Sequence, residues 1–229
     1  MLGSRKAVDA GRGNASRETS LLRAFRTSAP RFTFHGSGFT FHAAPFTPFL
    51  ASLMTSDLRY PIGRPERTAT LAPAARAAGI DAIAELPARL RAAVAGLDEA
   101  QLDTPYRDGG WTVRQLVHHV ADSHMHAFAR TRFALAEDNP RISAYDEAAW
   151  AELPDMRTMP VEVSLTLLDA LHQRWAAVLR ATPAASFART VQHPENGAMT
   201  VDALVNIYSW HGRHHTAHAT ALRERMGWR

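Results

Sequence analysis

Four long stretches after Ala77 carry apolar side chains at the three- and four-residue spacing that places them on one face of an α-helix. They cover about residues 80–97, 113–135, 164–181 and 200–226. No alternating strand pattern of comparable strength competes with them. Because each helix must bury its apolar face against another element, the sequence predicts an all-α protein built as an antiparallel four-helix bundle.

Specific residues mark the ends and the shape of these helices. Thr112 and Gln115 form a capping box at the start of the second helix, Thr200 caps the fourth, and Gly227 ends it. Pro87 is expected to bend the first helix. Two longer connections, at residues 136–163 and 182–199, can cover one end of the bundle. A short helix is predicted within the first connection, at residues 146–153.

Residues 1–53 differ from the rest of the chain in composition. They are rich in Gly, Ser, Arg and Phe, show no sustained period, and are predicted to form a disordered basic extension. Two explanations account for this segment: a transit peptide, or a start codon assigned upstream of the true one. We favour the second explanation because Met54 directly precedes sequence typical of a globular domain, which is predicted to cover residues 54–229.

The positive charge of the chain is concentrated in that extension. The chain has 26 basic and 22 acidic side chains, of which seven basic and two acidic ones lie in residues 1–53. The remaining nineteen basic and twenty acidic side chains leave the domain near neutral. A near-neutral domain lacks the positive surface that a phosphate backbone requires, which argues against nucleic-acid binding.

Two absences narrow the class of protein further. No run of about 18 apolar residues is present, so no membrane-spanning helix is predicted. Cysteine is absent, which excludes disulfides and thiolate metal sites and is consistent with a cytoplasmic protein. His, Asp and Glu are then the only strong ligands for a transition metal.

Histidines gather on two of the predicted helices. The second helix carries His118, His119, His124 and His126, and the fourth carries His211, His214, His215 and His218. A single histidine on a helix is usually only a polar surface group or a hydrogen-bonded core group. Several inward-facing imidazoles would cost about 1–3 kcal/mol each if they stayed unpaired, and a shared metal removes that cost. The pattern therefore predicts a histidine-based site for a divalent metal.

On the fourth helix, rotation by about 100° per residue determines which imidazoles face inward. His211 and His215 lie one turn apart on the apolar face, at the spacing that lets two ring nitrogens reach one metal. His218 falls near the same face, whereas His214 points partly away.

On the second helix, direction alone leaves the third ligand open. His119 lies at the edge of the apolar stripe and His118 nearly opposite it, so His119 is the better candidate of the two. His124 lies closer to the apolar arc than either residue and stays in contention.

Several long motifs in the chain are far more specific than a histidine-rich tract. They are Leu102–Gln115 (LDTPYRDGGWTVRQ), His118–Met125 (HHVADSHM), Tyr145–Glu147 with Trp150–Asp155, and Trp210–His218 (WHGRHHTAH). Together they closely resemble the YfiT branch of the DinB-like superfamily. The resemblance runs from about Met54 to Trp228 and omits the basic extension.

This resemblance implies a four-helix bundle with one zinc ion held by three histidines, in a metal-dependent hydrolase that forms cytoplasmic homodimers. Carried over to the matching positions, the ligands are His119, His211 and His215. Nickel or manganese would fit the same nitrogens. Some members of the superfamily transfer thiols, bacillithiol in particular, to electrophiles. Thiol transfer to a small-molecule substrate therefore stands beside hydrolysis, and a non-catalytic metal-binding protein is a third alternative.

No catalytic residue is assigned beside the ligands. Asp122, one turn after His119, is a candidate to orient an imidazole, although a solvated role is favoured. Asp146 and Glu147 are candidates for a general base, although a non-catalytic role, such as capping of the short helix by Asp146, is favoured.

The loop before the second helix offers candidates for substrate binding. Tyr106, Arg107 and Trp111 lie there, and Arg107 is the best candidate to bind an anionic group. Trp111 is expected to pack at the helix start, and Trp175 in the core.

Overall fold

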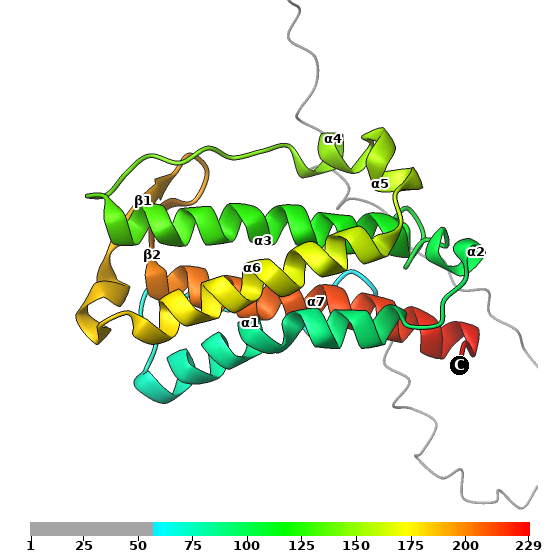
Figure 1. Ribbon diagram of the computed structural model, residues 1–229, viewed down its shortest axis with the longest axis horizontal. Coiled ribbons are helices and arrows are strands. Elements are labelled where there is room, and N and C mark those ends of the chain that lie inside the picture. Colours follow the sequence, from blue (N-terminus) through cyan, green and yellow to red (C-terminus); the bar gives the residue numbers. More distant parts are fainter. Residues whose placement is uncertain (1–56) are drawn as a thin grey trace, which may run out of the picture. The chain divides into compact units, whose positions relative to one another are not determined.

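The computed structural model describes residues 57–229, which form the predicted four-helix bundle (Figure 1). Its long helices are α1 (Pro73–Val94), α3 (Val113–Ala136), α6 (Val161–Ala181) and α7 (Val201–Met226). α1 begins earlier than predicted, with Pro73 in the first turn, where a missing N–H has no cost. The predicted extension 1–53 and the domain start at Met54 lie outside the described residues. Within those residues no helix has the length and apolar character needed to cross a membrane.

Each long helix packs against two others, and α1 lies diagonally opposite α3 (Figure 1). α3 and α6 run in the same direction, because the connection between them returns along the bundle to the end where α3 starts. α1 and α7 also run in the same direction, and Arg223 near the end of α7 donates hydrogen bonds to the carbonyls of Ala93 and Ala95 at the end of α1. The antiparallel pairs are α1 with α6 and α3 with α7.

The predicted caps form at the helix ends. Thr112 and Gln115 make a reciprocal capping box at the start of α3, and Thr200 accepts a hydrogen bond from the Ala203 N–H at the start of α7. Gly227 adopts the left-handed conformation, with φ 66°, that ends α7.

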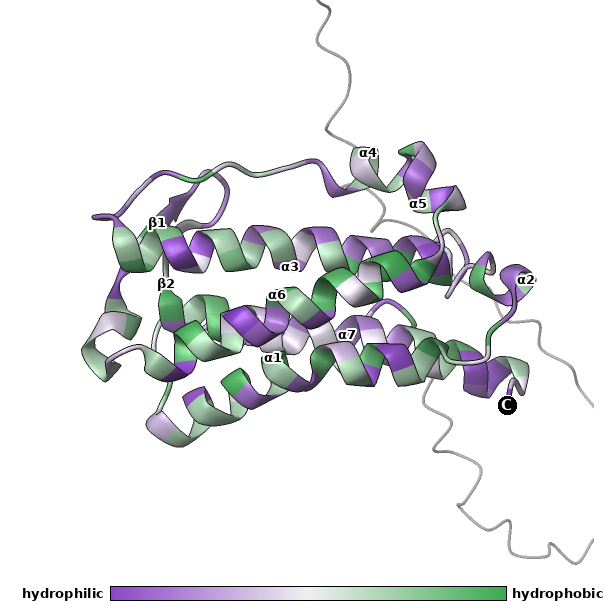
Figure 2. Cartoon of the chain, in the orientation of Figure 1, coloured by the Kyte–Doolittle hydropathy of each residue, from purple (hydrophilic) through white to green (hydrophobic). Residues whose placement is uncertain are grey.

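A layer of histidines divides the interior into two apolar clusters. One cluster joins the end of α1 to the start of α3 and includes Leu90 and Leu116. The other joins the start of α7 to the second half of α6 and includes Leu204 and Trp175. Hydrophilic positions accordingly interrupt the hydrophobic ones along α3, α6 and α7 (Figure 2). Polar groups buried in this layer need partners, since each unpaired one destabilises the fold.

Short elements occupy the connections between the long helices. They are α2 (Glu99–Leu102), α4 (Glu147–Ala151), α5 (Pro154–Thr158), η2 (Ala184–Ala188), β1 (Thr190–His193) and β2 (Gly197–Thr200). The short helix predicted over residues 146–153 is α4, and α5 follows it. The strands form an antiparallel hairpin with Thr190 opposite Thr200, an element not predicted from the sequence. Strands of four residues are too short to give a clear alternating pattern.

A buried ion pair joins the starts of α1 and α7. Arg76 Nε and Nη2 donate to the two carboxylate oxygens of Asp202 at 2.7 and 2.8 Å, and the Leu71 N–H donates to the same carboxylate at 2.9 Å. Burial alone would raise the pKa of Asp202, but the hydrogen bonds from Arg76 and Leu71 outweigh it and lower this pKa. Asp202 therefore stays charged while only 2% exposed.

We expect Asp202→Ala to lower the free energy of unfolding by about 3–5 kcal/mol, because it leaves the Arg76 guanidinium and the Leu71 N–H without their acceptor. Urea unfolding at neutral pH measures the change. Glu85→Ala is the control, since it removes an exposed pair with Arg89 and should cost no more than about 0.5 kcal/mol. Equal losses in the two variants would contradict this account.

Candidate metal centre

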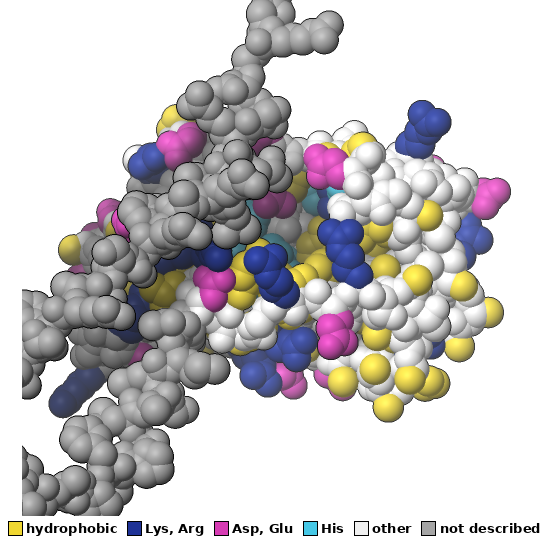
Figure 3. Space-filling view, turned by 180° about the vertical axis from the view of Figure 1, so that it is seen from behind, with side chains coloured by type: hydrophobic (Ala, Val, Ile, Leu, Met, Phe, Trp, Pro, Cys, Tyr) yellow, Lys and Arg dark blue, Asp and Glu magenta, His cyan; other side chains and the backbone are white. Residues whose placement is uncertain are grey.

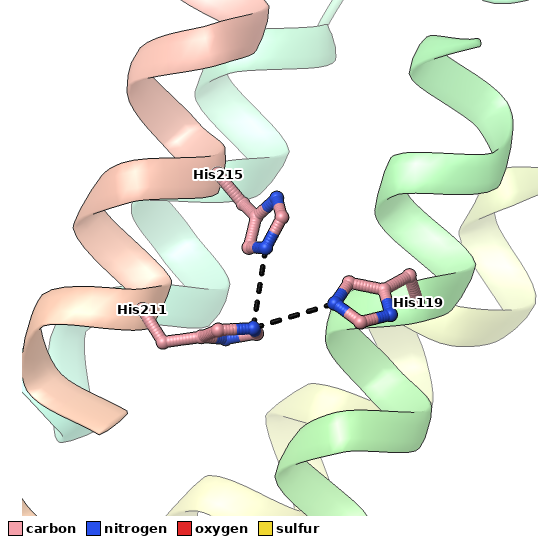
Figure 4. Close-up of side chains that lie close together, drawn as sticks. All are labelled: His119, His211 and His215. Atoms are coloured by element: carbon pink, nitrogen blue, oxygen red, sulfur yellow. Dashed lines mark hydrogen bonds between the residues drawn. The ribbon is translucent and has the colours of Figure 1, made fainter. Parts of the chain in front are cut away.

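Three histidines from two helices converge between the apolar clusters. His119 on α3 and His211 and His215 on α7 each offer one ring nitrogen, and these nitrogens lie within 4.8 Å of one another. The Nε2 atom of His211 lies 3.3 Å from Nε2 of His119 and 3.2 Å from Nε2 of His215. Figure 4 shows the two neighbouring rings aimed at that one atom. Of the two candidates for a third ligand on α3, the group contains His119 and not His124.

The spacing of these nitrogens fits a tetrahedral metal. With Zn–N bonds of about 2.0–2.1 Å, two ligand nitrogens of a tetrahedral zinc ion lie about 3.3 Å apart. The two Nε2 separations agree with this value. Three imidazoles that leave the fourth tetrahedral position free form a donor set typical of a catalytic rather than a structural zinc site.

Burial keeps the three imidazoles neutral. Desolvation, together with the nearby His214, lowers the pKa of His119 to about 4. Desolvation also lowers the pKa values of His211 and His215 well below the usual value, and the neighbouring histidines add to this effect. Because a metal binds the unprotonated nitrogen, these rings are ready to bind at neutral pH without releasing protons.

His118 and His214 stand outside the three-histidine group, as their directions on the helices predict, yet both are buried. His118 Nε2–H donates to the Met159 carbonyl at 3.0 Å, and its Nδ1 accepts from the Ser164 hydroxyl at 2.7 Å. His214 stacks on Trp210 with ring centroids 4.3 Å apart. Met159, which follows α5, and Ser164 near the start of α6 cover the outer side of α3, which helix direction alone does not reveal.

The remaining histidines of these helices have packing partners. His218 lies with its ring centroid 4.1 Å from that of Tyr106, and its Nε2 is 3.0 Å from Nε2 of His214. His126 stacks on Tyr145 with centroids 4.4 Å apart. His124 is fully buried directly behind His211.

A cavity of about 180 Å³ adjoins His211. The α3–α6 connection and the β-hairpin enclose it together with α3 and α7, and its polar lining includes Ser123, Arg130, Tyr145, Glu147, His193 and Tyr208. On the face seen in Figure 3, histidine atoms are visible among hydrophobic and charged side chains. His211 itself is only half-buried, so the three-histidine group is open to solvent on one side.

The acidic residues that were candidates for a general base or for orienting an imidazole lie in different places. Glu147 lines the cavity, and burial raises the pKa of its carboxyl. Asp146 caps α4 by accepting a hydrogen bond from the Ala149 N–H at 2.9 Å. Burial raises the pKa of Asp122 to about 6, and the nearby Asp155 adds to this shift. In the described part of the chain no hydrogen bond joins Asp122 to an imidazole, which leaves it without the orienting role considered above.

Arg130, and not Arg107, is the arginine that lines the cavity next to His211. Arg107 donates to the Asp108 carbonyl and lies outside the cavity. Arg130 is 8% exposed, donates to Tyr208 Oη and to the Ser143 carbonyl, and its Nε has no partner within residues 57–229. Arg130 follows His119 by eleven residues, or about three helical turns, so the two side chains lie on the same face of α3. This shared face could have identified Arg130 from the sequence.

Trp111 packs against the site itself, with its ring centroid 4.5 Å from that of His119. Tyr106 is buried against His218. Trp175 is fully buried in the core, as expected, and donates its indole N–H to Thr131. The loop before α3 therefore supports the histidines of α3 and α7 from one side.

The fold and the site together define a four-helix bundle with a histidine cluster fit to hold a metal. The family model of the DinB superfamily matches residues 82–219. The chain belongs to the DinB superfamily, as its motifs predicted.

Relatives from Bacillus are similar over the same region. A protein of Bacillus mycoides strain KBAB4 named "Putative metal-dependent hydrolase" is 51% identical over 172 residues, which cover 75% of this chain and 99% of the relative. A Bacillus cereus protein with the same description is 49% identical over 173 residues, or 76% of this chain and 99% of the relative.

A solved structure is similar as well. It is described as "YfiT from Bacillus subtilis is a probable metal-dependent hydrolase with an unusual four-helix bundle topology". It shares 45% sequence identity and a TM-score of 0.73 with this chain, and the match covers 75% of this chain and 99% of the other.

Proposed function

We propose that this protein is a metal-dependent hydrolase in which His119, His211 and His215 hold one zinc ion. The observation that carries the proposal is the convergence of three neutral imidazoles beside a polar cavity, with Nε2 of His211 at tetrahedral spacing from Nε2 of His119 and of His215. The names of the relatives support the same class of reaction.

When bound, zinc supplies a Lewis acid that polarises a substrate carbonyl and activates water at neutral pH. The chain supplies the remaining groups from the walls of the cavity. Because burial raises the pKa of Glu147 toward neutral pH, its carboxyl is suited to accept a proton from the attacking water and return it to the leaving group. The Nε–H of Arg130, which has no partner among residues 57–229, can bind an anionic or carbonyl oxygen of the substrate.

The cavity also limits the size of the group that reacts. Its volume of about 180 Å³ accommodates only a small acyl portion next to His211. A more apolar hollow of about 420 Å³ shares Asn196, Met199 and Ile207 with it. We infer that the reacting carbonyl lies near the histidines while the rest of a small organic substrate extends into this second hollow.

An activity screen of the full-length, zinc-loaded protein tests the proposal. We expect it to hydrolyse activated esters or amides, and we expect Glu147→Gln to lower kcat by at least about 100-fold, the usual contribution of a general base. Glu152→Gln is the matched control, because Glu152 is exposed and pairs only with Arg157 in the described structure.

A parallel screen with a thiol and an electrophile separates the alternatives. Thiol transfer without hydrolysis would replace the proposed reaction with S-transfer, since a zinc site also stabilises a thiolate. Neither reaction, in a protein that retains its zinc, would favour a non-catalytic metal-binding protein.

A further inference from the structure

A second row of histidines lies behind His211, inside the bundle. His211 Nδ1 is 3.1 Å from Nε2 of His124, and His124 Nδ1 is 3.1 Å from Nε2 of His172 on α6. His172 Nδ1 lies 2.5 Å from the carbonyl oxygen of Ile83 on α1. His124 is 0% exposed and His172 1%, so water does not compete for these bonds. The row connects α7, α3, α6 and α1 through one chain of hydrogen bonds.

Pro87 explains why the Ile83 carbonyl is free to end this row. Within an α-helix the carbonyl of Ile83 would accept the N–H of the residue four positions later. That residue is Pro87, which has no N–H. The buried carbonyl therefore needs a donor from outside its helix, and His172 provides it.

The carbonyl sets the direction of every hydrogen bond in the row. A carbonyl oxygen only accepts, so the proton of His172 is on Nδ1, and Nε2 of a neutral ring is left as an acceptor. His124 must then donate from Nδ1 and accept at Nε2. His211 in turn donates from Nδ1, which leaves the lone pair of its Nε2 directed at His119 and His215.

Neutral rings are required for this direction, and the surroundings provide them. None of the described carboxylates hydrogen-bonds to His124 or His172, whose partners are other imidazoles and the Ile83 carbonyl. Burial lowers the pKa of His172 to about 4 and outweighs the charge of nearby Asp169, which acts to raise this pKa, so the ring stays neutral.

We infer that His124 and His172 are positioning residues that hold His211 in the Nδ1–H tautomer and so direct its Nε2 toward the metal. The inference rests on the proposed metal site. Zinc-binding histidines usually donate the second ring N–H to a carboxylate, a carbonyl or water. Here two further histidines carry that role from His211 to a carbonyl that a proline leaves free.

Nitrogen NMR of the full-length protein, labelled with ¹⁵N-histidine, tests the direction of the row. We expect His124 and His172 to carry their protons on Nδ1, both with and without zinc, and a ¹⁵N–¹⁵N coupling across the bond from His124 Nδ1 to His172 Nε2. A proton on Nε2 of either ring would overturn the inference. Because this readout does not need zinc, it stays valid if the proposed hydrolase function fails.

Zinc affinity, measured by competition with a chromophoric chelator, tests the consequence for the metal site. We expect His124→Phe to weaken zinc binding by about 10–100-fold, the usual effect of losing the partner of a ligand. His172→Phe should have a smaller effect in the same direction, and His172→Gln should restore affinity because its amide oxygen can accept from His124. His126→Phe, on the same helix but outside the row, is the control. Affinities equal to the control in all three variants would overturn the inference.

A double-variant comparison tests the role of the Ile83 carbonyl. His172→Phe leaves this carbonyl unpaired in the natural chain, whereas Pro87→Ala supplies a helical N–H to it. We therefore expect the Tm loss caused by His172→Phe to be smaller in the Pro87→Ala background. An equal loss in both backgrounds would overturn the assignment of this carbonyl as the end of the row.

Discussion

Replacing His119, His211 or His215 with alanine is expected to remove most of the bound zinc. Each variant keeps only two of the three protein ligands. The loss of zinc affinity should therefore exceed about 100-fold, the largest effect usually seen when only the hydrogen-bond partner of a ligand is removed. Metal content per chain after dialysis, measured by elemental analysis on the full-length variants, checks the result.

His118→Ala and His214→Ala are the matched controls, since each removes an adjacent buried imidazole that lies outside the group. Both should keep the metal. His124→Ala and His218→Ala should weaken binding without emptying the site, because these residues pack beside the group. If His118→Ala or His214→Ala lost zinc while the variant of the neighbouring ligand kept it, the metal would lie on another face of α3 or α7.

The metal-free protein is expected to lose much of its stability between pH 6.5 and pH 4. Burial is the main cause that lowers the pKa values of His119 and His172 to about 4, whereas an unfolded histidine has a pKa of about 6.5. As the pH falls, the unfolded chain takes up protons first, so the free energy of unfolding decreases through this window. Each of the two histidines accounts for about 3 kcal/mol once the pH is below both values.

Urea unfolding of the chelator-treated protein at several pH values between 7.5 and 4.5 measures this loss. The raised pKa of Asp122 acts in the opposite sense, because its folded form takes up a proton near pH 6, and it offsets part of the decrease. His172→Phe removes one of the histidines whose pKa burial lowers, and it should make the dependence on pH shallower. A free energy of unfolding that stays constant from pH 7.5 to 4.5 would contradict the account.

Local signals explain why the four long helices could be predicted from the sequence. The capping box at Thr112 and the stop at Gly227 act within a few residues of the helix ends they determine. His211 and His215 could be paired for the same reason, since one helical turn fixes their relative direction. The family motifs then selected His119 over His124, which direction alone had left open.

Features that depend on packing between distant segments could not be predicted. The β-hairpin has strands of four residues, and its pairing depends on the end of the bundle that it closes. The direction of α6 relative to α3 depends on a connection with no strong periodic pattern. The homodimer that the resemblance implies stays a prediction, because no residue pattern in the sequence marks an interface.

His172 shows how a functional residue can be overlooked on an apolar helix face. It lies one turn after Leu168 and seven residues before Leu179, on the apolar face of the helix predicted over residues 164–181. A polar residue on such a face needs a buried partner, which here is the carbonyl left free by Pro87. The two signals are 85 residues apart, so only the packed bundle connects them.

Anomalous diffraction at the zinc edge, from crystals of the zinc-loaded full-length protein, tests the central claim most directly. The account predicts one strong peak per chain, about 2.0–2.1 Å from Nε2 of His119, His211 and His215. A peak bound instead by His214 and His218, or no peak at the three-histidine group, would contradict it.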